Sequence, residues 1–269
     1  MNRNLWIGSV LVGLVVLAAL VSFVWTPHDP LKVDAAVRLA GPSADYWFGT
    51  DKFGRDVASQ IMVGARSTLY VGVIAVGVAA IIGTPLGILA AMSKRWLGEL
   101  VMRVNDLVLA FPALLLAIMF GAVYGASTVT AMIAIGIATI PSFARIARSA
   151  TLQVMSTEYV LAARAGGRSR LSIARRHVLR NIAGLVIVQC SVSFAIAVLA
   201  EAALSFLGFG TRPPTPSWGR MLQESQELLT VQPRLALVPG VAIAVAVLGF
   251  NLLGDGLRDR FDPRLEGRR

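Results

Sequence analysis

The clearest pattern in this sequence is a series of long apolar runs separated by polar connections. A helix that crosses the hydrocarbon core of a bilayer needs about 20 mostly apolar residues, because each residue advances it by about 1.5 Å. Six runs meet this length, at residues 5–25, 68–92, 100–123, 126–144, 182–207 and 235–254. The pattern therefore predicts an all-α, polytopic membrane protein with six transmembrane helices.

The first apolar run has the position of a secretory signal peptide but not its usual length. It is longer than a typical signal-peptide core, and no A-x-A cleavage site occurs before the sequence TPHDP. We therefore expect a retained anchor. On this basis the chain divides into residues 1–67, which hold the anchor and an extracytoplasmic segment, and residues 68–269, a transmembrane domain with five helices.

Two polar connections, residues 26–67 and 208–234, are too long for simple turns between helices. In the first, Val57, Ile61 and Ala65 recur at helical spacing, and Thr50 or Asp51 is placed to cap the preceding turn. The second has a proline-rich turn followed by a short amphipathic pattern. We expect each connection to form a lid on the membrane surface, with solvated loops as the alternative.

The composition supports the membrane assignment, and it changes what the net positive charge indicates about partners. The chain is 56% apolar and 15% charged, which is unlike a soluble protein of 269 residues. A net charge of +10 would suggest nucleic acid as a partner in a soluble protein. Here 17 of the 25 Lys and Arg residues fall on connections that share one side with the N-terminus. Because cytoplasmic loops are rich in these residues, we predict that both termini are cytoplasmic and expect no nucleic acid.

The sequence lacks the motifs of an enzyme, a redox protein or a metal site. Cys190 is the single cysteine, and His28 and His177 are predicted on opposite sides of the membrane. No Walker A loop is present, so the chain cannot cradle nucleotide phosphates in such a loop. We therefore expect no metal or cofactor on this chain, and ATP hydrolysis only on a partner subunit.

Charged residues inside predicted spans are costly in lipid and need an explanation. Glu201, in the fifth run, either lines a substrate path or bonds to neighbouring backbone or to the outer loop. Arg103 and Asp106 lie three residues apart on the third run, and we predict an interfacial salt bridge between them. We interpret the prolines within or at the ends of spans as packing kinks rather than gate hinges: Pro85, Pro112 and Pro141.

The stretch EYVLAARAGGRSRLSIARRHVLRN, residues 158–181, is unusually basic for a connection between two spans. It holds six arginines and one acid. Helix-forming residues flank Gly166 and Gly167, which predicts a helix, a tight turn and a second helix. The charge distribution places this structure on the cytoplasmic side.

This stretch resembles the EAA loop of the inner-membrane permease subunits of bacterial ABC importers. The matching core is Leu161-Ala162-Ala163, followed by Gly167. Leu161 stands where the family has glutamate, and Arg180 stands where proline is usual. The flanking segments FGTDKFGRDVASQIMVGARSTL and EAALSFLGFGTRPPTPSWGRML resemble the dipeptide, oligopeptide and nickel permeases, and among these the C-type subunit.

The resemblance implies a type I ABC importer permease fold and a transport subunit without an ATPase site. Such a chain would form half of a pathway for dipeptides or short oligopeptides, with nickel or a metal chelate as the alternative substrate. One competing class is a stand-alone channel or secondary transporter, which would need no coupling loop. The other is a membrane enzyme, and the missing catalytic motifs count against it. The implied partners are a B-type permease subunit, two ATPase domains carrying ATP and Mg²⁺, and an extracytoplasmic binding protein, all at the bacterial inner membrane.

The resemblance also implies two groups of functional residues. The loop of about residues 150–181 would couple to the ATPase, with arginines pairing either with acids on that subunit or with anionic lipid. Its candidate contact residues are Tyr159, Leu161, Ala162, Ala163, Arg164, Gly166, Gly167 and Arg168. The candidates for gating or extracytoplasmic docking are Asp51, Arg55, Asp56, Glu201, Pro213, Pro214 and Trp218.

Overall fold

The computed structural model describes residues 3–261, and the long helices in this part of the chain confirm the all-α prediction. Five helical runs are long and apolar enough to cross a membrane. They are α1 (Arg3–Ser22), α2 (Val57–Met92), α5 (Thr128–Met155), the continuous run Arg170–Phe206, and α10 (Arg234–Phe261). The run Arg170–Phe206 comprises α7 (Arg170–Ile173), η2 (Ala174–Val178), which is a π-helical turn, and α8 (Leu179–Phe206). A sixth crossing forms if α3 (Arg95–Ala110) and α4 (Ala113–Tyr124) count as one broken span.

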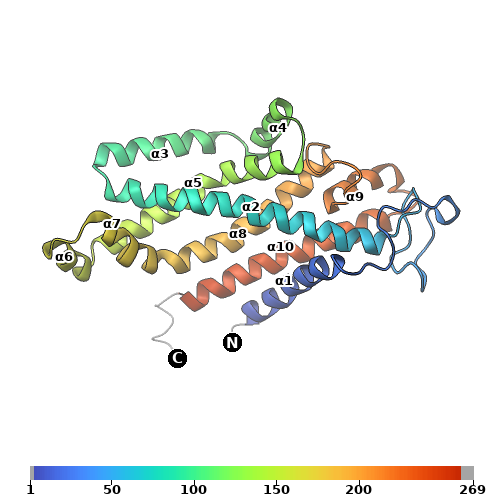
Figure 1. Cartoon of the computed structure of the whole chain (residues 1–269), viewed down its shortest axis with the longest axis horizontal. Coiled ribbons are helices and arrows are strands. Elements are labelled where there is room, and N and C mark those ends of the chain that lie inside the picture. The colour runs from blue at the N-terminus through green and yellow to red at the C-terminus, as the bar shows by residue number, and fades with distance from the viewer. Residues whose placement is uncertain (1–2, 262–269) are drawn as a thin grey trace.

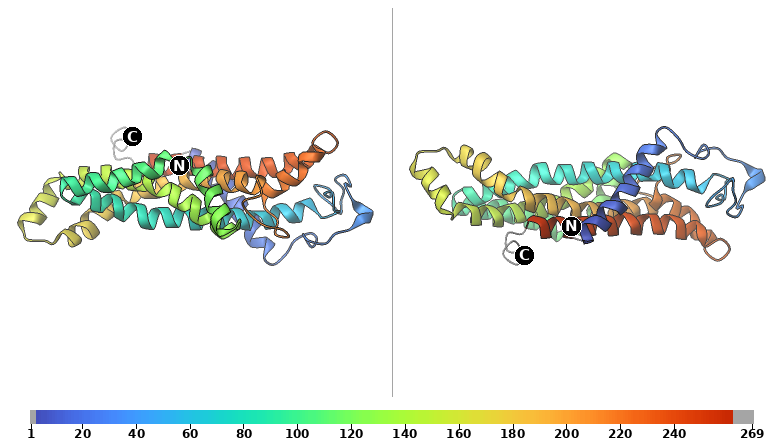
Figure 2. Two further views of the ribbon diagram at one scale, coloured as in Figure 1. Left: turned by 90° about the horizontal axis from the view of Figure 1, so that it is seen from above. Right: turned by 90° about the horizontal axis from the view of Figure 1, so that it is seen from below.

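The long helices lie side by side along the long axis of the molecule, which has two distinct ends (Figure 1). At one end, called here the loop end, lie the first loop segment (residues 26–56), with the short η1 (Ala35–Val37), and the second loop segment (residues 207–233). The second segment contains α9 (Trp218–Ser225) and η3 (Gln226–Leu228). At the opposite end, called the hairpin end, α6 (Glu158–Ala165) and α7 project beyond the other helices (Figure 2). The start of α1 and the end of α10 point toward the hairpin end.

Small residues allow these helices to pack closely. Gly87 of α2 lies directly against Ala147 of α5, and Gly256 of α10 lies against Leu5 of α1. A side chain at either glycine would collide with the neighbouring helix, so close approach explains why glycine occupies these positions. Lipid gives helices no hydrophobic reason to associate, and van der Waals contact between closely spaced backbones supplies the attraction instead.

The lid expected over residues 57–67 is wrong, because these residues form the first turns of α2. This helix has 36 residues and begins after Asp56, whose carboxylate accepts a hydrogen bond from the Ser59 backbone N–H at 2.9 Å. Asp56 therefore caps α2, and Asp51 caps the preceding turn as predicted, because its carboxylate accepts from the backbone N–H groups of Phe53 at 2.8 Å and Arg55 at 2.9 Å. A helix of this length spans about 54 Å and extends beyond a hydrocarbon core of about 30 Å. The boundary placed between residues 67 and 68 falls inside it.

The short amphipathic helix expected in residues 208–234 is confirmed as α9. Ser217 caps it by accepting a hydrogen bond from the Arg220 N–H at 3.3 Å. The helix packs against α8 and α10 and touches α2. Trp218 is buried there, and its indole N–H donates to the Ile61 carbonyl at 3.0 Å. Tertiary packing therefore holds α9 within the loop end.

The third predicted span, residues 100–123, is not a single straight helix. Helix α3 ends at Ala110, and α4 begins after Pro112 at an angle of 81° to it. Proline disfavours the helical conformation in the residue before it, and Phe111 accordingly has an extended backbone, with φ −87° and ψ 127°. The reading of Pro112 as a mild packing kink is therefore wrong. Pro85 and Pro141, by contrast, lie inside continuous helices.

The salt bridge predicted between Arg103 and Asp106 is wrong, because Asp106 has a different partner. Asp106 accepts a hydrogen bond at 2.8 Å from Arg145 of α5, not from Arg103. The pair therefore links two helices instead of two turns of one helix. Both side chains are more than half exposed, so the contribution of the pair to stability is small.

Candidate functional site

The basic stretch folds into a helical hairpin with a turn that requires glycine. Helix α6 ends in a Schellman motif: the N–H of Gly167 donates to the carbonyl of Arg164 at 3.0 Å, and the N–H of Arg168 donates to that of Ala163 at 3.1 Å. Gly167 has φ +75°, a conformation that other residues rarely adopt. Ser169 then caps α7 by accepting from the N–H of Ser172. This confirms the predicted order of helix, tight turn and helix.

A small buried cluster fixes the hairpin to the long helices. Val160 of α6, Ile173 of α7 and Val178 of η2 are almost fully buried, together with Ala147 of α5 and Ile182 of α8. Burying an aliphatic side chain of this size stabilises the fold by roughly 1.5–3 kcal/mol. The hairpin is therefore packed against both α5 and α8.

The outer surface of the hairpin is exposed and mixes apolar with basic groups. Leu161 is 50% exposed and Leu171 is 68% exposed, although both are aliphatic. Tyr159 is also exposed and contacts the ring of His177, with 5.8 Å between the ring centroids. The remaining predicted contact residues lie on this surface as well, with Ala163 half-buried and the others exposed: Ala162, Ala163, Arg164, Gly166, Gly167 and Arg168. The hairpin thus brings the whole first group of candidates together.

At the loop end, four charged side chains form a chain of ion pairs between the two loop segments. The Arg55 guanidinium donates to Asp51 at 2.6 Å and to Glu224 of α9 at 2.5 Å. Glu224 also accepts a hydrogen bond from Arg220 at 2.8 Å. The side chains of Arg55 and Glu224 are only 12% and 18% exposed, so water screens their interaction weakly. This network fixes α9 against the start of α2.

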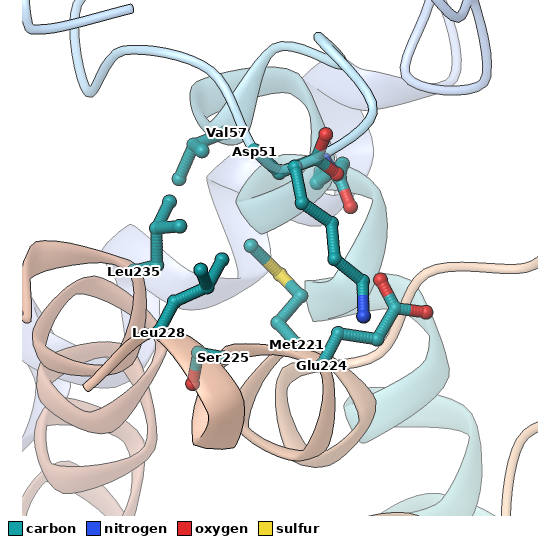
Figure 3. Close-up of a pocket in the computed structure, with 9 residues that line it drawn as sticks. Asp51, Val57, Met221, Glu224, Ser225, Leu228 and Leu235 are labelled. Carbon is teal, nitrogen blue, oxygen red and sulfur yellow. The ribbon is translucent and has the colours of Figure 1, made fainter. Parts of the chain in front are cut away.

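The ion pairs border a small hollow that has room for about one water molecule. Val57, Leu228 and Leu235 form its apolar side, and Asp51 and Glu224 form its polar side (Figure 3). A hollow of this size does not accommodate a peptide. The carboxylates at its edge therefore serve to join the two loop segments.

The remaining loop-end candidates are distributed over separate positions. Asp56 is buried at the start of α2, with its carboxylate 3.6 Å from the imidazole of His28. Glu201 is buried in α8 and accepts a hydrogen bond from Ser205 at 2.7 Å. Pro213 and Pro214 are exposed on the second loop segment. Of this group, the structure joins Asp51 and Arg55 in an ion pair, and it places the start of α9, which holds Trp218, next to Glu201, since Gly219 lies directly against Ala202.

Arg234, at the start of α10, is a residue that the sequence analysis missed. Its guanidinium donates hydrogen bonds to four backbone carbonyls of the first loop segment, those of Leu39, Ala40, Phe48 and Thr50, at 2.6 to 3.3 Å. The planar guanidinium of arginine presents more N–H donors, in a fixed fork, than the ammonium of lysine does, and this suits a set of four separate acceptors. The local sequence gives no signal for this role, because all four partners are main-chain atoms distant in the chain.

A large part of the chain matches the model of a known protein family. The family model described as "Binding-protein-dependent transport system inner membrane component" matches residues 83–267. This range contains the hairpin, α8, α9 and α10. It begins within α2 and omits α1 and the first loop segment.

Relatives match over nearly the whole chain. The dipeptide transport system permease protein DppC of Alkalihalophilus pseudofirmus is 41% identical, covering 98% of this chain and 87% of that protein. The glutathione transport system permease protein GsiD of Pectobacterium atrosepticum is 39% identical over 96% of this chain and 87% of its own length. A putative peptide transport system permease protein of Brucella abortus is 42% identical, with coverage of 98% and 89%.

Among solved structures, a chain of the MetNI methionine ABC transporter in an inward-facing conformation has a TM-score of 0.64. It is 16% identical and covers 76% of this chain and 96% of that chain, so the likeness concerns the fold alone. It confirms the expected permease fold. Taken with the family match, the chain belongs to the binding-protein-dependent inner membrane components: it is a multi-pass permease subunit of an ABC transporter, which works with an ATPase and a binding protein and has no catalytic site of its own.

Proposed function

We propose that this permease forms one half of the translocation pathway of an importer for dipeptides and short oligopeptides. Relatives at about 40% identity are named for dipeptide, glutathione and peptide transport. Glutathione is itself a short peptide, so these names describe one chemical class. The resemblance of residues 48–69 and 201–222 to the C-type subunit supports a B-type permease as the other half.

The hairpin of α6 and α7 is the proposed coupling element. One observation supports this proposal: the hairpin has an exposed surface of aliphatic and small residues, and a buried cluster attaches it to the long helices. Exposed Leu161 and Leu171 are costly in water and favour a protein partner. Ala162 and Gly167 leave room for close approach, and the nearby arginines offer charge to acids on the ATPase.

The path from the ATPase to the membrane follows from how the hairpin is connected. Only two residues separate the end of α5 from the start of α6, and α7 continues through η2 into α8. Closure of two ATPase domains on ATP would draw the hairpins of the two permeases together. Because the hairpin is packed rigidly on α5 and α8, the movement would rock these helices and alternate access to the pathway.

The substrate assignment is tested by uptake in a strain that lacks this chain. Cells carrying the parent gene should regain uptake of labelled di- and tripeptides, and cells with the empty vector should not. Nickel uptake, measured in the same cells, should stay unchanged. Restored nickel uptake without peptide uptake would replace the peptide assignment with the metal alternative.

The coupling role is tested by adding bulk to the hairpin surface. Ala162 is exposed, so Ala162→Trp should fold normally yet hold the ATPase away. The expected result is loss of ATPase capture and of substrate-stimulated ATP hydrolysis, with normal amounts of permease in the membrane. Arg168→Ala, at the rim of the same surface, should have a smaller effect because interface energy concentrates at central contacts.

A second pair of variants separates backbone strain from bulk. Gly167→Ala introduces strain at φ +75°, but the added methyl group would meet no described residue other than its neighbours in the chain. Gly167→Trp has the same strain plus a large side chain, and should impair coupling further. If Ala162→Trp and Gly167→Trp both retain ATPase capture and stimulated hydrolysis, the hairpin is not the coupling element and its arginines are better explained as contacts to anionic lipid.

A further inference from the structure

Two half-exposed tryptophans at the loop end have no role in the proposed transport mechanism. Trp25 follows α1 and Trp47 belongs to the first loop segment; their ring centroids lie 6.2 Å apart at an interplanar angle of 47°. They are 51% and 54% exposed. We propose that this tryptophan pair binds the headgroup layer of the bilayer and anchors the first loop segment to the membrane surface.

The position of Trp25 along α1 places it at the surface of the membrane. Its N–H still donates to the carbonyl of Val21 at 2.8 Å, so the helical path continues to this residue. Trp6, near the other end of α1, is 56% exposed. At about 1.5 Å per residue the two tryptophans are separated by roughly 28 Å, close to the hydrocarbon thickness of about 30 Å. Tryptophan is enriched at both membrane–water interfaces, so α1 has one at each boundary.

A charged residue of α2 marks the same boundary independently. The Arg66 guanidinium donates to the Ser22 hydroxyl, at the end of α1, at 2.6 Å, and lies 4.0 Å from the centroid of the Phe23 ring. From residue 67 to residue 93 the sequence of α2 and its cap has no charged residue. Because an arginine is costly in hydrocarbon, the apolar interior begins on the far side of Arg66. Trp25 lies just beyond Ser22 and therefore in the headgroup layer.

Contact with Trp25 brings Trp47 to the same depth. The headgroup regions add about 10–15 Å to the bilayer, or roughly 5–7 Å on each side, which is comparable to the separation of the two rings. The backbone on both sides of Trp47 is held in place. Tyr46 stacks on His28 with 4.7 Å between centroids, and the carbonyl of Phe48 is bound by Arg234 at 2.7 Å.

The chemistry of the patch favours lipid over a protein partner. The patch is continuous with the end of a membrane-spanning helix, where Val24 is 92% exposed. An indole ring has an apolar body and one N–H donor, which suits the boundary between acyl chains and headgroups. The bilayer would then be a further attachment for the first loop segment, in addition to its contacts within the protein, such as those to Arg234 and the ion pair between Arg55 and Glu224.

Photo-crosslinking in the intact transporter tests this proposal. p-Benzoyl-phenylalanine is incorporated at the position of Trp47, and in a matched control at Val33, which lies in the same segment and is 64% exposed. After irradiation of cell membranes, mass spectrometry of the purified permease should show phospholipid adducts at position 47, several-fold more abundant than at position 33. Equal lipid labelling at both positions, or adducts only to protein such as the binding protein, would overturn the proposal.

A second experiment replaces Trp47 by mutation and needs no crosslinking probe. In proteoliposomes of phosphatidylethanolamine and phosphatidylglycerol, Trp47→Ser should increase protease cleavage of the first loop segment several-fold, whereas Trp47→Phe should stay near the parent rate because it retains an aromatic ring. In detergent micelles, which have no bilayer surface, the difference between the two variants should shrink. A difference of the same size in detergent would indicate packing within the protein and count against the lipid contact.

Discussion

The carboxylate of Glu201 joins helix α8 to the loop that follows it. One of its oxygens accepts hydrogen bonds from the hydroxyls of Ser205, at 2.7 Å, and Thr211, at 3.4 Å. Ser205 in turn accepts from the backbone N–H of Thr211 at 3.0 Å. Glu201 is 1% exposed, and within residues 3–261 its other carboxylate oxygen has no hydrogen-bond partner. Of the two readings left open by the sequence, the geometry favours a structural bond to the loop over a place on the substrate path.

This interpretation predicts that transport needs the hydrogen-bond acceptor oxygen of Glu201 but not its negative charge. Glu201→Gln retains an oxygen for Ser205 and Thr211, so peptide uptake should stay close to that of the parent. Glu201→Ala leaves two buried hydroxyls without their acceptor and should lower stability by about 1–3 kcal/mol for each unsatisfied group. Uptake and the thermal stability of the purified transporter are measured for both variants. Loss of uptake in a stable, assembled Glu201→Gln transporter would instead place the carboxylate in the gate or the path.

At the scale of elements, the pair of Arg55 and Glu224 attaches α9 to the segment that precedes α2. Each side chain also has a second partner, Asp51 for Arg55 and Arg220 for Glu224. Because the central pair is mostly buried, removing one member leaves the other charge incompletely compensated. The pair therefore matters more for the packing of the loop end than an exposed ion pair would.

A double-mutant cycle should reveal this coupling. Arg55→Gln and Glu224→Gln should each lower the free energy of unfolding by about 1–3 kcal/mol, and the double variant by clearly less than the sum. Melting of the purified transporter provides the measurement. Lys52 and Glu227 offer a matched control, since they lie 3.9 Å apart and the Glu227 side chain is 85% exposed; their coupling should be near zero. Additive effects at Arg55 and Glu224 would show that the pair does not join the two elements.

The same scale shows which elements can be predicted from the sequence. The long apolar runs and the glycine turn after α6 were predictable, because hydrophobic length and a positive φ are properties of local sequence. The break before Pro112 had a local signal, but a proline inside a span does not by itself distinguish a kink from a break. The spacing of Val57, Ile61 and Ala65 predicted helix, but its continuity with the span that was expected to begin at residue 68 was missed, because the first turns of α2 carry polar residues that pack on other elements. Arg234 and Arg66 were missed because their partners lie far away in the sequence.

At the scale of the whole molecule, the two ends face opposite sides of the membrane and differ in how many arginines they hold. The hairpin end holds the basic stretch of residues 158–181, whose six arginines are spread over α6, the glycine turn, α7, η2 and the start of α8, and the last turn of α10 adds Arg258 and Arg260. The loop end holds both loop segments. Arg264, Arg268 and Arg269, which also contributed to the predicted charge bias, lie outside the described residues. The excess of Lys and Arg at the hairpin end predicts that this end, together with the start of α1, lies in the cytoplasm.

Cysteine labelling of sealed cells tests this orientation. Ser43 and Thr215 at the loop end and Ser169 at the hairpin end are all exposed, so reactivity should depend on the side of the membrane rather than on burial. In a Cys190→Ser background, which removes the native thiol, an impermeant maleimide should label Ser43→Cys and Thr215→Cys in intact cells. Ser169→Cys should react only after the cells are permeabilised, which also verifies that its thiol is accessible. Labelling of Ser169→Cys in sealed cells, with the loop-end thiols protected, would reverse the orientation and remove the hairpin from the compartment that holds ATP.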